Sequence, residues 1–153
     1  MPPVYSASPS HGPLRQGEIL SGLTELRAVA DITDETGEIG ANIVEHPFAL
    51  VLTQDCDLDL DFKARFGTEG DTPHHKLFPN VLFCELWLAS DLRGNHGLNS
   101  TLWRAVRKNT DERYHFLPRA LPEEDALGKG FEDDLVIDFK RSLRSAPKPS
   151  IPV

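Results

Sequence analysis

The fold is decided by the stretch PFALVLTQDCDLDLDFKARFG, residues 47–67. Its first part, Phe48 to Thr53, is a continuous apolar run of strand length, which is typical of a strand buried on both faces. In its second part Leu58, Phe62 and Phe66 recur every four residues between charged side chains, which predicts an amphipathic helix. We therefore expect a buried strand that passes directly into a helix.

The ends of this helix carry recognisable signals. Asp55 or Asp57 is expected to cap its N-terminus, because a short carboxylate side chain accepts hydrogen bonds from the first free backbone N–H groups. Gly67 follows the last apolar residue and is expected to end the helix.

Outward from this stretch, the chain reads mainly as strands. Val81 to Trp87 and Leu135 to Phe139 are further apolar runs, expected to join Phe48–Thr53 as central strands of one bent sheet. We also expect short strands at 17–21, 24–30 and 113–117, a loop at 31–40, a turn at 90–94 and a second helix at 100–108. No βαβ rhythm recurs. The predicted fold class is β-rich α+β: a small bent sheet or SH3-like partly open barrel with two inserted helices.

Length and composition predict one domain. The chain has 153 residues, which suits a single core. Proline is concentrated at both ends, so residues 1–13 are expected to be a disordered lead-in and residues 145–153 a Pro-rich tail. The globular domain is expected to occupy residues 14–144.

The net charge indicates which classes of partner the protein has, and the cysteine content indicates its cellular compartment. The formal net charge of −8 disfavours a nucleic-acid partner, which usually requires a basic face. No apolar run approaches the ~18 residues of a membrane span, and the N-terminus lacks the pattern of a secretory signal. Two cysteines are too few for a disulfide-stapled secreted domain, so we expect free, buried thiols and a cytoplasmic protein. A partner protein or a homodimer is the expected partner, with no membrane and no cofactor.

The densest group of polar side chains follows the first apolar run, at Thr53, Gln54, Asp55, Cys56 and Asp57. Polar groups at a strand end can project into a cleft. A helix N-terminus lowers the pKa of a thiol, whereas neighbouring carboxylates raise it. The segment is therefore either a catalytic or binding site, or a helix cap with a packed cysteine.

A second candidate is the concentration of basic and aromatic residues in the second half of the chain, chiefly Arg104, Arg107, Arg113 and Tyr114. Such a mixture suits phosphate or single-stranded nucleic acid. The alternative is a solvated helix face beside an ordinary strand aromatic. Alternation along a strand would place Arg113 and His115 on one face and Tyr114 on the other.

The sequence does not support a metal site. The alternating aspartates from Asp55 lack the glycine and glutamate of a calcium loop, so they are expected to start and flank the helix. Cys56, His74, His75 and Cys84 are the right types for zinc, but their spacing matches no zinc motif. We predict that both thiols are free of metal.

Two segments resemble a known family. Gly17-Glu18-Ile19-Leu20 and the run from His46 to Thr53 are similar to the first strand and the Pro-Ala-Val-Leu-Ser strand of MazF/PemK-like proteins. This resemblance implies an SH3-like barrel, often dimeric, and a ribonuclease of a bacterial toxin–antitoxin pair. The family usually has Arg where this chain has His46. The segments 113–118 and 134–139 also resemble bacterial proteins with a Gln-Asp-Cys-Asp segment, for which no activity is implied.

Two functions from different classes follow. The first is a non-catalytic binding module of a bacterial protein, in a defence or toxin–antitoxin setting. The alternative is a MazF-like endoribonuclease in which Asp55, Cys56 and His115 are catalytic, and Thr53 and Arg113 line the same cleft. The alternative requires His115 and Arg113 to lie near Asp55 or Cys56, and the sequence leaves open whether the chain is an enzyme.

Overall fold

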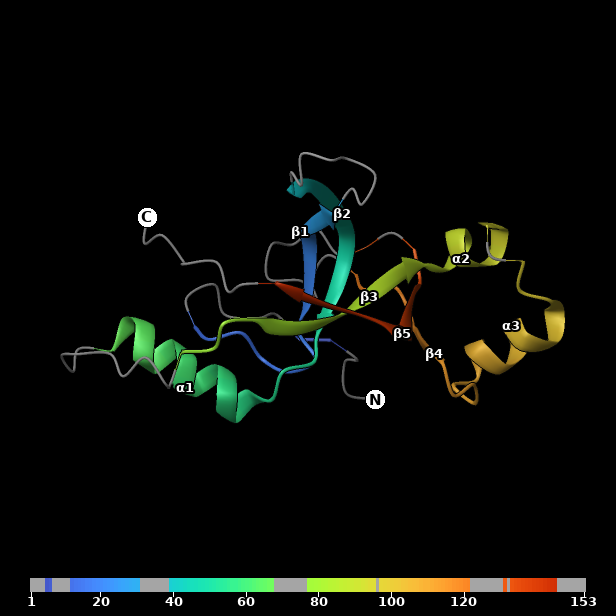
Figure 1. The fold of residues 1–153 in the computed structure, drawn as a ribbon. Helices are drawn as coiled ribbons and strands as arrows, with labels where there is room; N and C mark the ends of the chain where they lie inside the picture. The colour runs from blue at the N-terminus through green and yellow to red at the C-terminus, as the bar shows by residue number, and fades with distance from the viewer. Residues whose placement is uncertain are drawn as a thin grey trace.

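The computed structural model describes residues 5–6, 12–30, 39–67, 77–95, 97–121, 131 and 133–145, and it confirms a β-rich α+β fold. The described residues form an antiparallel sheet in the order β1-β2-β3-β5-β4, which is open because its two ends, β1 and β4, are not paired with each other (Figure 1). The strands are β1 (Ile19–Ala30), β2 (Ile39–Val51), β3 (Val81–Leu88), β4 (Tyr114–Leu117) and β5 (Leu135–Ser145). The helices are α1 (Asp55–Phe66), α2 (Ala89–Asn95) and α3 (Ser100–Arg107).

The three apolar runs are confirmed as the central strands. They lie at the end of β2, which stops at Val51, and in β3 and β5, between the edge strands β1 and β4. In β3, Phe83 packs in a cluster with Leu58 of α1, and its neighbour Cys84 packs in a different cluster. Burial of both faces explains why these strands show no alternation of apolar and polar residues.

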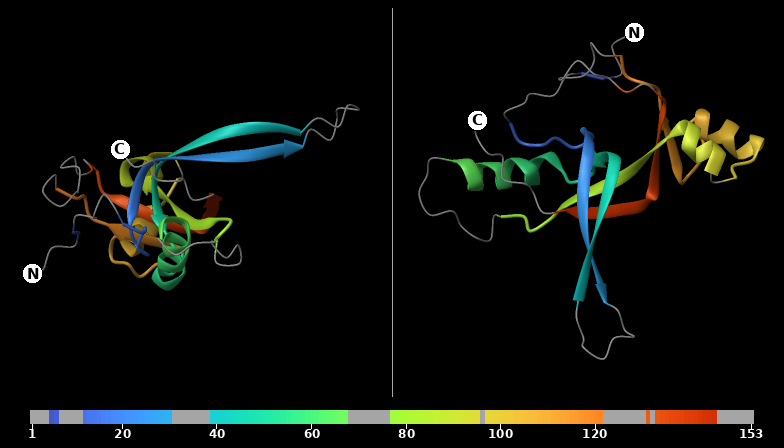
Figure 2. Two further views of the ribbon diagram at one scale, coloured as in Figure 1. Left: turned by 90° about the vertical axis from the view of Figure 1, so that its left-hand side faces the viewer. Right: turned by 90° about the horizontal axis from the view of Figure 1, so that it is seen from above.

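The sheet bends sharply in β5. Cys84 lies opposite Ser142, whereas Leu86 lies opposite Ile137, so the register between β3 and β5 shifts at this point. Extra residues in one strand kink it, and Figure 2 shows β5 turning there. The first half of β5 pairs with β4 and the end of β3, and its second half pairs with the beginning of β3.

This bend separates two helical regions, which lie on opposite sides of the molecule in Figure 1. Leu58 of α1 packs with Val51, Val81 and Leu143 at one end of β3. Leu92 of α2 and Val106 of α3 pack with Tyr114 and Val136 at the other end. Each helical region therefore has its own hydrophobic cluster, and β3 and β5 connect the two.

β1 and β2 extend beyond the sheet as a two-stranded hairpin arm, residues 23–30 and 39–46. β3 pairs with β2 only from Phe48 to Val51, so the earlier part of β2 pairs with β1 alone. Figure 2 shows the arm projecting from the rest of the molecule. At its base, Gly22 has a φ of 66°, a backbone conformation that glycine adopts without strain, and neighbours Pro47, which has no N–H for the ladder.

Several predicted boundaries were wrong. The two strands expected at 17–21 and 24–30 are one strand, β1, and β2 begins at Ile39, inside the expected loop. Residues 31–38 of that loop lie outside the described residues. β5 continues to Ser145 instead of ending near Phe139. In each case pairing with a neighbouring strand extends the strand through residues whose local pattern predicts a break.

The helices also differ from expectation at their ends. The turn expected at 90–94 is a third helix, α2, because Leu92 anchors it in the core. Gln54 rather than an aspartate is the N-cap of α1, without a side-chain cap bond, whereas Gly67 ends that helix as predicted. No helix among the described residues has the length and apolar character needed to cross a membrane.

Candidate functional site

Side chains of the polar segment that follows β2 form hydrogen bonds that hold neighbouring parts of the fold together. The Thr53 hydroxyl accepts a hydrogen bond from the Leu82 N–H (2.8 Å), which fastens the end of β2 to β3. The Asp55 carboxylate accepts the Gln16 N–H (2.6 Å), which fastens the N-terminal segment to the start of α1. Two of the five predicted site residues in this segment thus have structural partners.

The two thiols differ in environment. Cys56 is exposed, contrary to the expectation of burial, and its sulfur lies 3.7 Å from oxygen atoms of Gln54 and Asp57. Cys84 is buried, and its thiol donates to the Asp138 carbonyl (3.0 Å). Burial, together with the carboxylates of Asp138 and Glu85, raises the pKa of Cys84 to about 11, so this thiol stays protonated at neutral pH.

Arg113 is held in a bidentate ion pair. Its Nε and Nη2 atoms donate to the two oxygens of Asp138, at 2.8 and 2.6 Å. Asp138 is buried, and burial alone would raise its pKa, but hydrogen bonds from Arg113 and from the Lys140 N–H hold that pKa below its usual value. The guanidinium also lies over the Tyr114 ring, which is buried. Arg113 therefore connects the start of β4 to β5.

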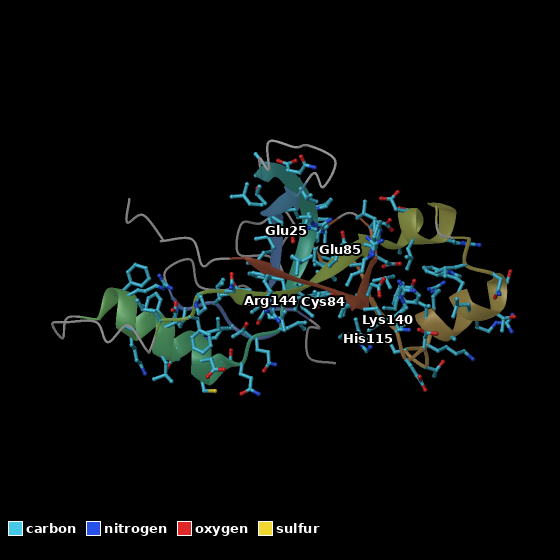
Figure 3. All side chains as sticks on the ribbon, viewed as in Figure 1. Glu25, Cys84, Glu85, His115, Lys140 and Arg144 are labelled. Atoms are coloured by element: carbon cyan, nitrogen blue, oxygen red, sulfur yellow. The ribbon has the colours of Figure 1, made fainter. Side chains whose placement is uncertain are left out.

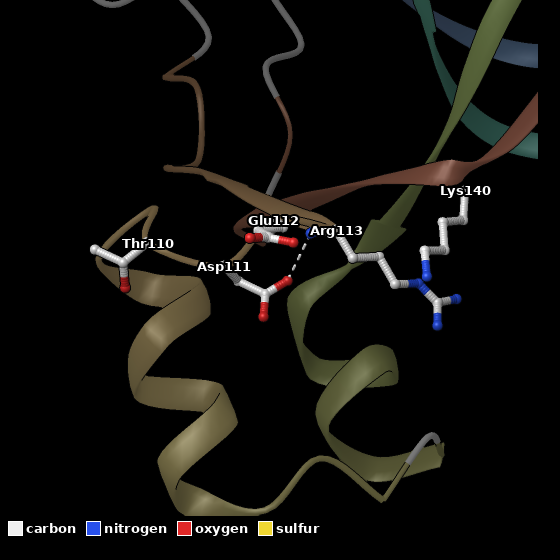
Figure 4. A pocket seen from close by; sticks show the side chains of 5 residues that line it. All are labelled: Thr110, Asp111, Glu112, Arg113 and Lys140. Carbon is white, nitrogen blue, oxygen red and sulfur yellow. Dashed lines mark hydrogen bonds between the residues drawn. The ribbon is translucent and has the colours of Figure 1, made fainter.

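A cavity of about 440 Å³ adjoins this ion pair (Figure 4). It is lined by Thr110, Asp111, Glu112, Arg113 and Lys140. Asp111 accepts the backbone N–H groups of Arg113 and Tyr114, both at 2.9 Å, so it holds the turn that precedes β4. The cavity therefore combines two cations with two carboxylates and offers no excess of either charge.

His115 lies far from the polar segment after β2. It pairs with Ile137, which pairs with Leu86, whereas Thr53 is fastened to Leu82. Leu86 and Leu82 are four residues apart on β3, which is about 13 Å along the strand. Across the sheet, β2 and β4 are separated by three strand spacings, which is about 14 Å. The His115 ring instead packs near Phe139 (centroids 6.5 Å apart). The structure thus does not bring His115 to Asp55 and Cys56.

Arg104 and Arg107 belong to α3, which the sequence places correctly. Asn99 caps this helix by accepting the Leu102 N–H (2.9 Å), and Val106 is fully buried beneath it. Arg104 and Arg107 are on its exposed side. The end of α3 is joined to β4 by Asn109, whose side-chain amide bonds both the N–H and the C=O of Phe116. This connection places Phe116 beside α3.

Arginine and aromatic side chains alternate on this part of the molecule. The Arg93 guanidinium lies 5.9 Å from the Trp103 ring centroid, and that of Arg107 lies 5.5 Å from the Phe116 centroid. The two rings meet edge to face, with centroids 6.4 Å apart. We call Arg93, Trp103, Arg104, Arg107 and Phe116 the α2–α3 surface. In the described part of the chain, none of its three arginines has a carboxylate within ion-pair distance.

A cavity of about 230 Å³ lies in the α2–α3 surface, lined by Ala89, Ser90, Arg93, Trp103, Arg107, Asp133 and Asp134. Ser90 hydrogen-bonds Asp133 through its N–H and its hydroxyl, and the hydroxyl bond lowers the pKa of that carboxyl. Asp134 accepts the Arg119 N–H (2.9 Å). The two carboxylates at this end of the cavity are thus held by other groups, while the arginines lie on aromatic rings.

A second charged network crosses the sheet at the base of the arm, where Figure 3 labels Glu25 and Glu85. His46 is buried, with Nε2 2.9 Å from Glu25 and Nδ1 3.2 Å from Glu85. Arg27 pairs with Glu25, and Arg141 pairs with Glu85. Burial alone would raise the pKa of Glu25, but hydrogen bonds from Arg27 and His46 lower it. This network connects β1, β2, β3 and β5.

Sequence reasoning missed Arg93, Asp138 and the burial of His46. The sequence around Arg93 predicts a turn, which gives no reason to expect this side chain beside α3. Asp138 carried a signal, since a carboxylate inside the apolar run 135–139 needs a partner when it is buried. His46 carried no comparable signal, because its partners Glu25 and Glu85 come from distant strands.

The described residues contain no group of three or more His, Cys, Asp or Glu side chains arranged to hold a metal ion. His74 and His75, two members of the zinc set weighed above, lie outside the described residues. The chain matches no family model, and the curated proteins and solved structures compared with it give no match either.

Proposed function

We propose that this protein is a non-catalytic binding module whose α2–α3 surface docks an acidic segment of a partner protein. The observation that carries the proposal is the pair of arginines, Arg93 and Arg107, that lie on aromatic rings and line a cavity without a carboxylate partner among the described residues. A guanidinium on a ring keeps its outward N–H groups free for a carboxylate, and the ring limits its motion.

The charges around the surface favour a protein over a nucleic acid. Asp133 and Asp134 line the same cavity as Arg93 and Arg107, and the chain carries a net charge of −8. A phosphate backbone presents a charge at every nucleotide and would meet these carboxylates as well as the arginines. An acidic peptide can place single carboxylates on the arginines and apolar side chains on Trp103 and Phe116.

The ribonuclease alternative is not supported by these positions. General acid–base cleavage requires its groups within hydrogen-bonding reach of one substrate. His115 is remote from Asp55 and Cys56, and the guanidinium of Arg113 is occupied by Asp138. A bacterial defence or toxin–antitoxin setting rests on the sequence resemblance alone, and the genes beside this one would test it. We also place the module in the cytoplasm, which its two free cysteines favour.

Binding of labelled peptides tests the proposal. We expect a labelled peptide that carries two glutamates spaced by leucines to show a rise in fluorescence anisotropy on titration with the protein, and the same peptide with glutamine in place of glutamate to show no change. Arg107→Gln should weaken binding of the glutamate–leucine peptide about tenfold, since a hydrogen bond to a charged group contributes about 1.5 kcal/mol. The affinity should also fall as salt is added.

The matched control is Arg144→Gln. Arg144 is exposed on the second half of β5 (labelled in Figure 3), and its substitution removes the same charge away from the α2–α3 surface. We expect this variant to bind like the wild type. An equal loss in both variants would show that only net charge matters and would overturn the proposal. Preferential binding of single-stranded RNA, or no binding of the acidic peptide, would overturn it as well.

A further inference from the structure

Along the hairpin arm, none of the described strands covers the outer edge of β1. β1 is the last strand of the sheet, and among the described residues only β2 pairs with it. In both views of Figure 2 the arm projects away from the rest of the molecule. The free N–H and C=O groups of an edge strand are a template for pairing with another chain, so proteins normally protect such an edge.

The same part of the arm exposes large apolar side chains. Leu26 is 73% exposed and Ile43 is 69% exposed, the two highest values among the large apolar residues of the described chain. They are register partners in β1 and β2, so they lie side by side on one face of the arm. An apolar pair beside an open strand edge indicates an interaction site.

We propose that two copies of this chain dimerise through antiparallel pairing of β1 with β1, centred on Leu26. A two-fold axis perpendicular to the joined sheet keeps each side chain on the same side of the sheet in both copies. Residues directly opposite each other in antiparallel strands also share a side, so the axis must pass between one residue and the same residue of the second copy. The segment from Gly22, at the base of the arm, to Ala30, the last residue of β1, has Leu26 as its midpoint.

The charges of β1 favour this register over the two adjacent ones. Glu25 and Arg27 flank Leu26, so pairing centred on Leu26 sets Glu25 opposite Arg27 of the second copy and Arg27 opposite Glu25 of the second copy. A shift of the centre to Glu25 or to Arg27 would place like charges directly opposite each other, which is destabilising. Arg27 is 54% exposed and can reach across the new pairing.

The same register also covers the apolar pair. The two Leu26 side chains lie opposite each other at the symmetry axis, and each is flanked by Ile43 of its own chain. Four apolar side chains thus form one continuous row across the joined arms. A single strand pair is a small interface, so we expect a dissociation constant on the order of micromolar.

Disulfide trapping tests this register directly. In a Cys56→Ser background, Leu26→Cys places two thiols opposite each other at the axis, where Cβ atoms of paired residues are about 5 Å apart. The matched control is Ile43→Cys, whose two copies would lie about 14 Å apart, three strand spacings away. Both sites are exposed, so both variants should fold, which circular dichroism verifies.

We expect mild oxidation to convert the Leu26→Cys protein to a covalent dimer and to leave the Ile43→Cys protein monomeric. Equal trapping of both variants would indicate face-to-face packing of the arms and would overturn the strand pairing. Absence of trapping at Leu26→Cys would overturn it too.

Sedimentation of the otherwise unmodified chain provides the second measurement. The wild type should associate with rising concentration, and Leu26→Lys should weaken dimerisation at least about tenfold, because two ammonium groups then meet at the axis. Ile43→Lys should weaken it less, since its charges stay about 14 Å apart. A wild type that remains monomeric at millimolar concentration would refute the dimer and leave a different protein as the occupant of this edge.

Discussion

Replacement of Arg113 by alanine is expected to destabilise the fold by leaving a buried carboxylate without its partner. Asp138 is only 2% exposed and receives two bonds from the Arg113 guanidinium. Breaking a fully buried pair in this way costs about 3–5 kcal/mol. The Arg113 side chain is 41% exposed, so water screens the pair, and we expect a loss of about 2–3 kcal/mol at pH 7.

The loss should depend on pH in a defined direction. Because the pKa of Asp138 is lowered in the folded wild type, its contribution to stability is present above the unfolded-state value of about 3.9 and disappears as the pH falls through the folded value. In Arg113→Ala the same carboxyl remains buried without the guanidinium, so its folded pKa should rise. The folded variant then binds a proton more readily than the unfolded chain and gains stability as the pH falls.

The difference in free energy of unfolding between the wild type and Arg113→Ala should therefore shrink from pH 7 toward pH 4. Urea unfolding followed by tryptophan fluorescence measures it at each pH. Arg144→Ala, an exposed arginine on the same strand, is the control and should change the free energy of unfolding by less than about 0.5 kcal/mol. The reasoning would be refuted if Arg113→Ala lost less than about 0.5 kcal/mol of stability at pH 7, or if it lost as much stability at pH 4.5 as at pH 7.

Three further outcomes follow from the described contacts. Leu92→Ala should lower the free energy of unfolding by about 2–4 kcal/mol, because Leu92 is 1% exposed, whereas Leu60→Ala on the surface of α1 should change it little; similar losses in urea unfolding would contradict this. Asn99→Ala should cost about 1 kcal/mol by removing the cap bond to Leu102, and Asn99→Asp should retain most of the stability in the same assay. An aromatic disulfide reagent should label Cys56 at once and Cys84 only on unfolding; rapid labelling of both in the native protein would be inconsistent with the burial of Cys84.

The central strands and the helices α1 and α3 were predictable because their signals are local. The apolar run in β2 and the four-residue spacing in α1 each lie within one element. Of the arm, only the part of β1 expected at 24–30 was predictable. The beginning of β2 was not, since its glycine-containing sequence predicts a loop and is stabilised as a strand by pairing with β1. α2 was missed for a related reason: a single anchor, Leu92, holds a short helix whose sequence favours a turn.

The positions of the candidate site residues were likewise predictable only where a local pattern determines them. Arg104 and Arg107 were identified correctly as exposed residues of a helix, because helical spacing fixes their side. The partners of Arg113 and the separation of His115 from Asp55 depend on strand order, which puts β5 between β3 and β4. Nothing in the local pattern around Arg113 indicates that Asp138, 25 positions later, would occupy its guanidinium.

The position of β5 in the sheet affects how the chain folds during its synthesis. This strand is the last to be synthesised among the described elements, yet it lies inside the sheet, between β3 and β4. It also supplies Leu143 to one hydrophobic cluster and Val136 to another, so neither cluster can be completed on a ribosome-bound chain that ends before β5. Until β5 emerges, the edges of β3 and β4 that it will cover remain open to other chains. We therefore expect a nascent chain to need protection by a chaperone until β5 has emerged, and a chain truncated after β4 to aggregate rather than to form a smaller domain.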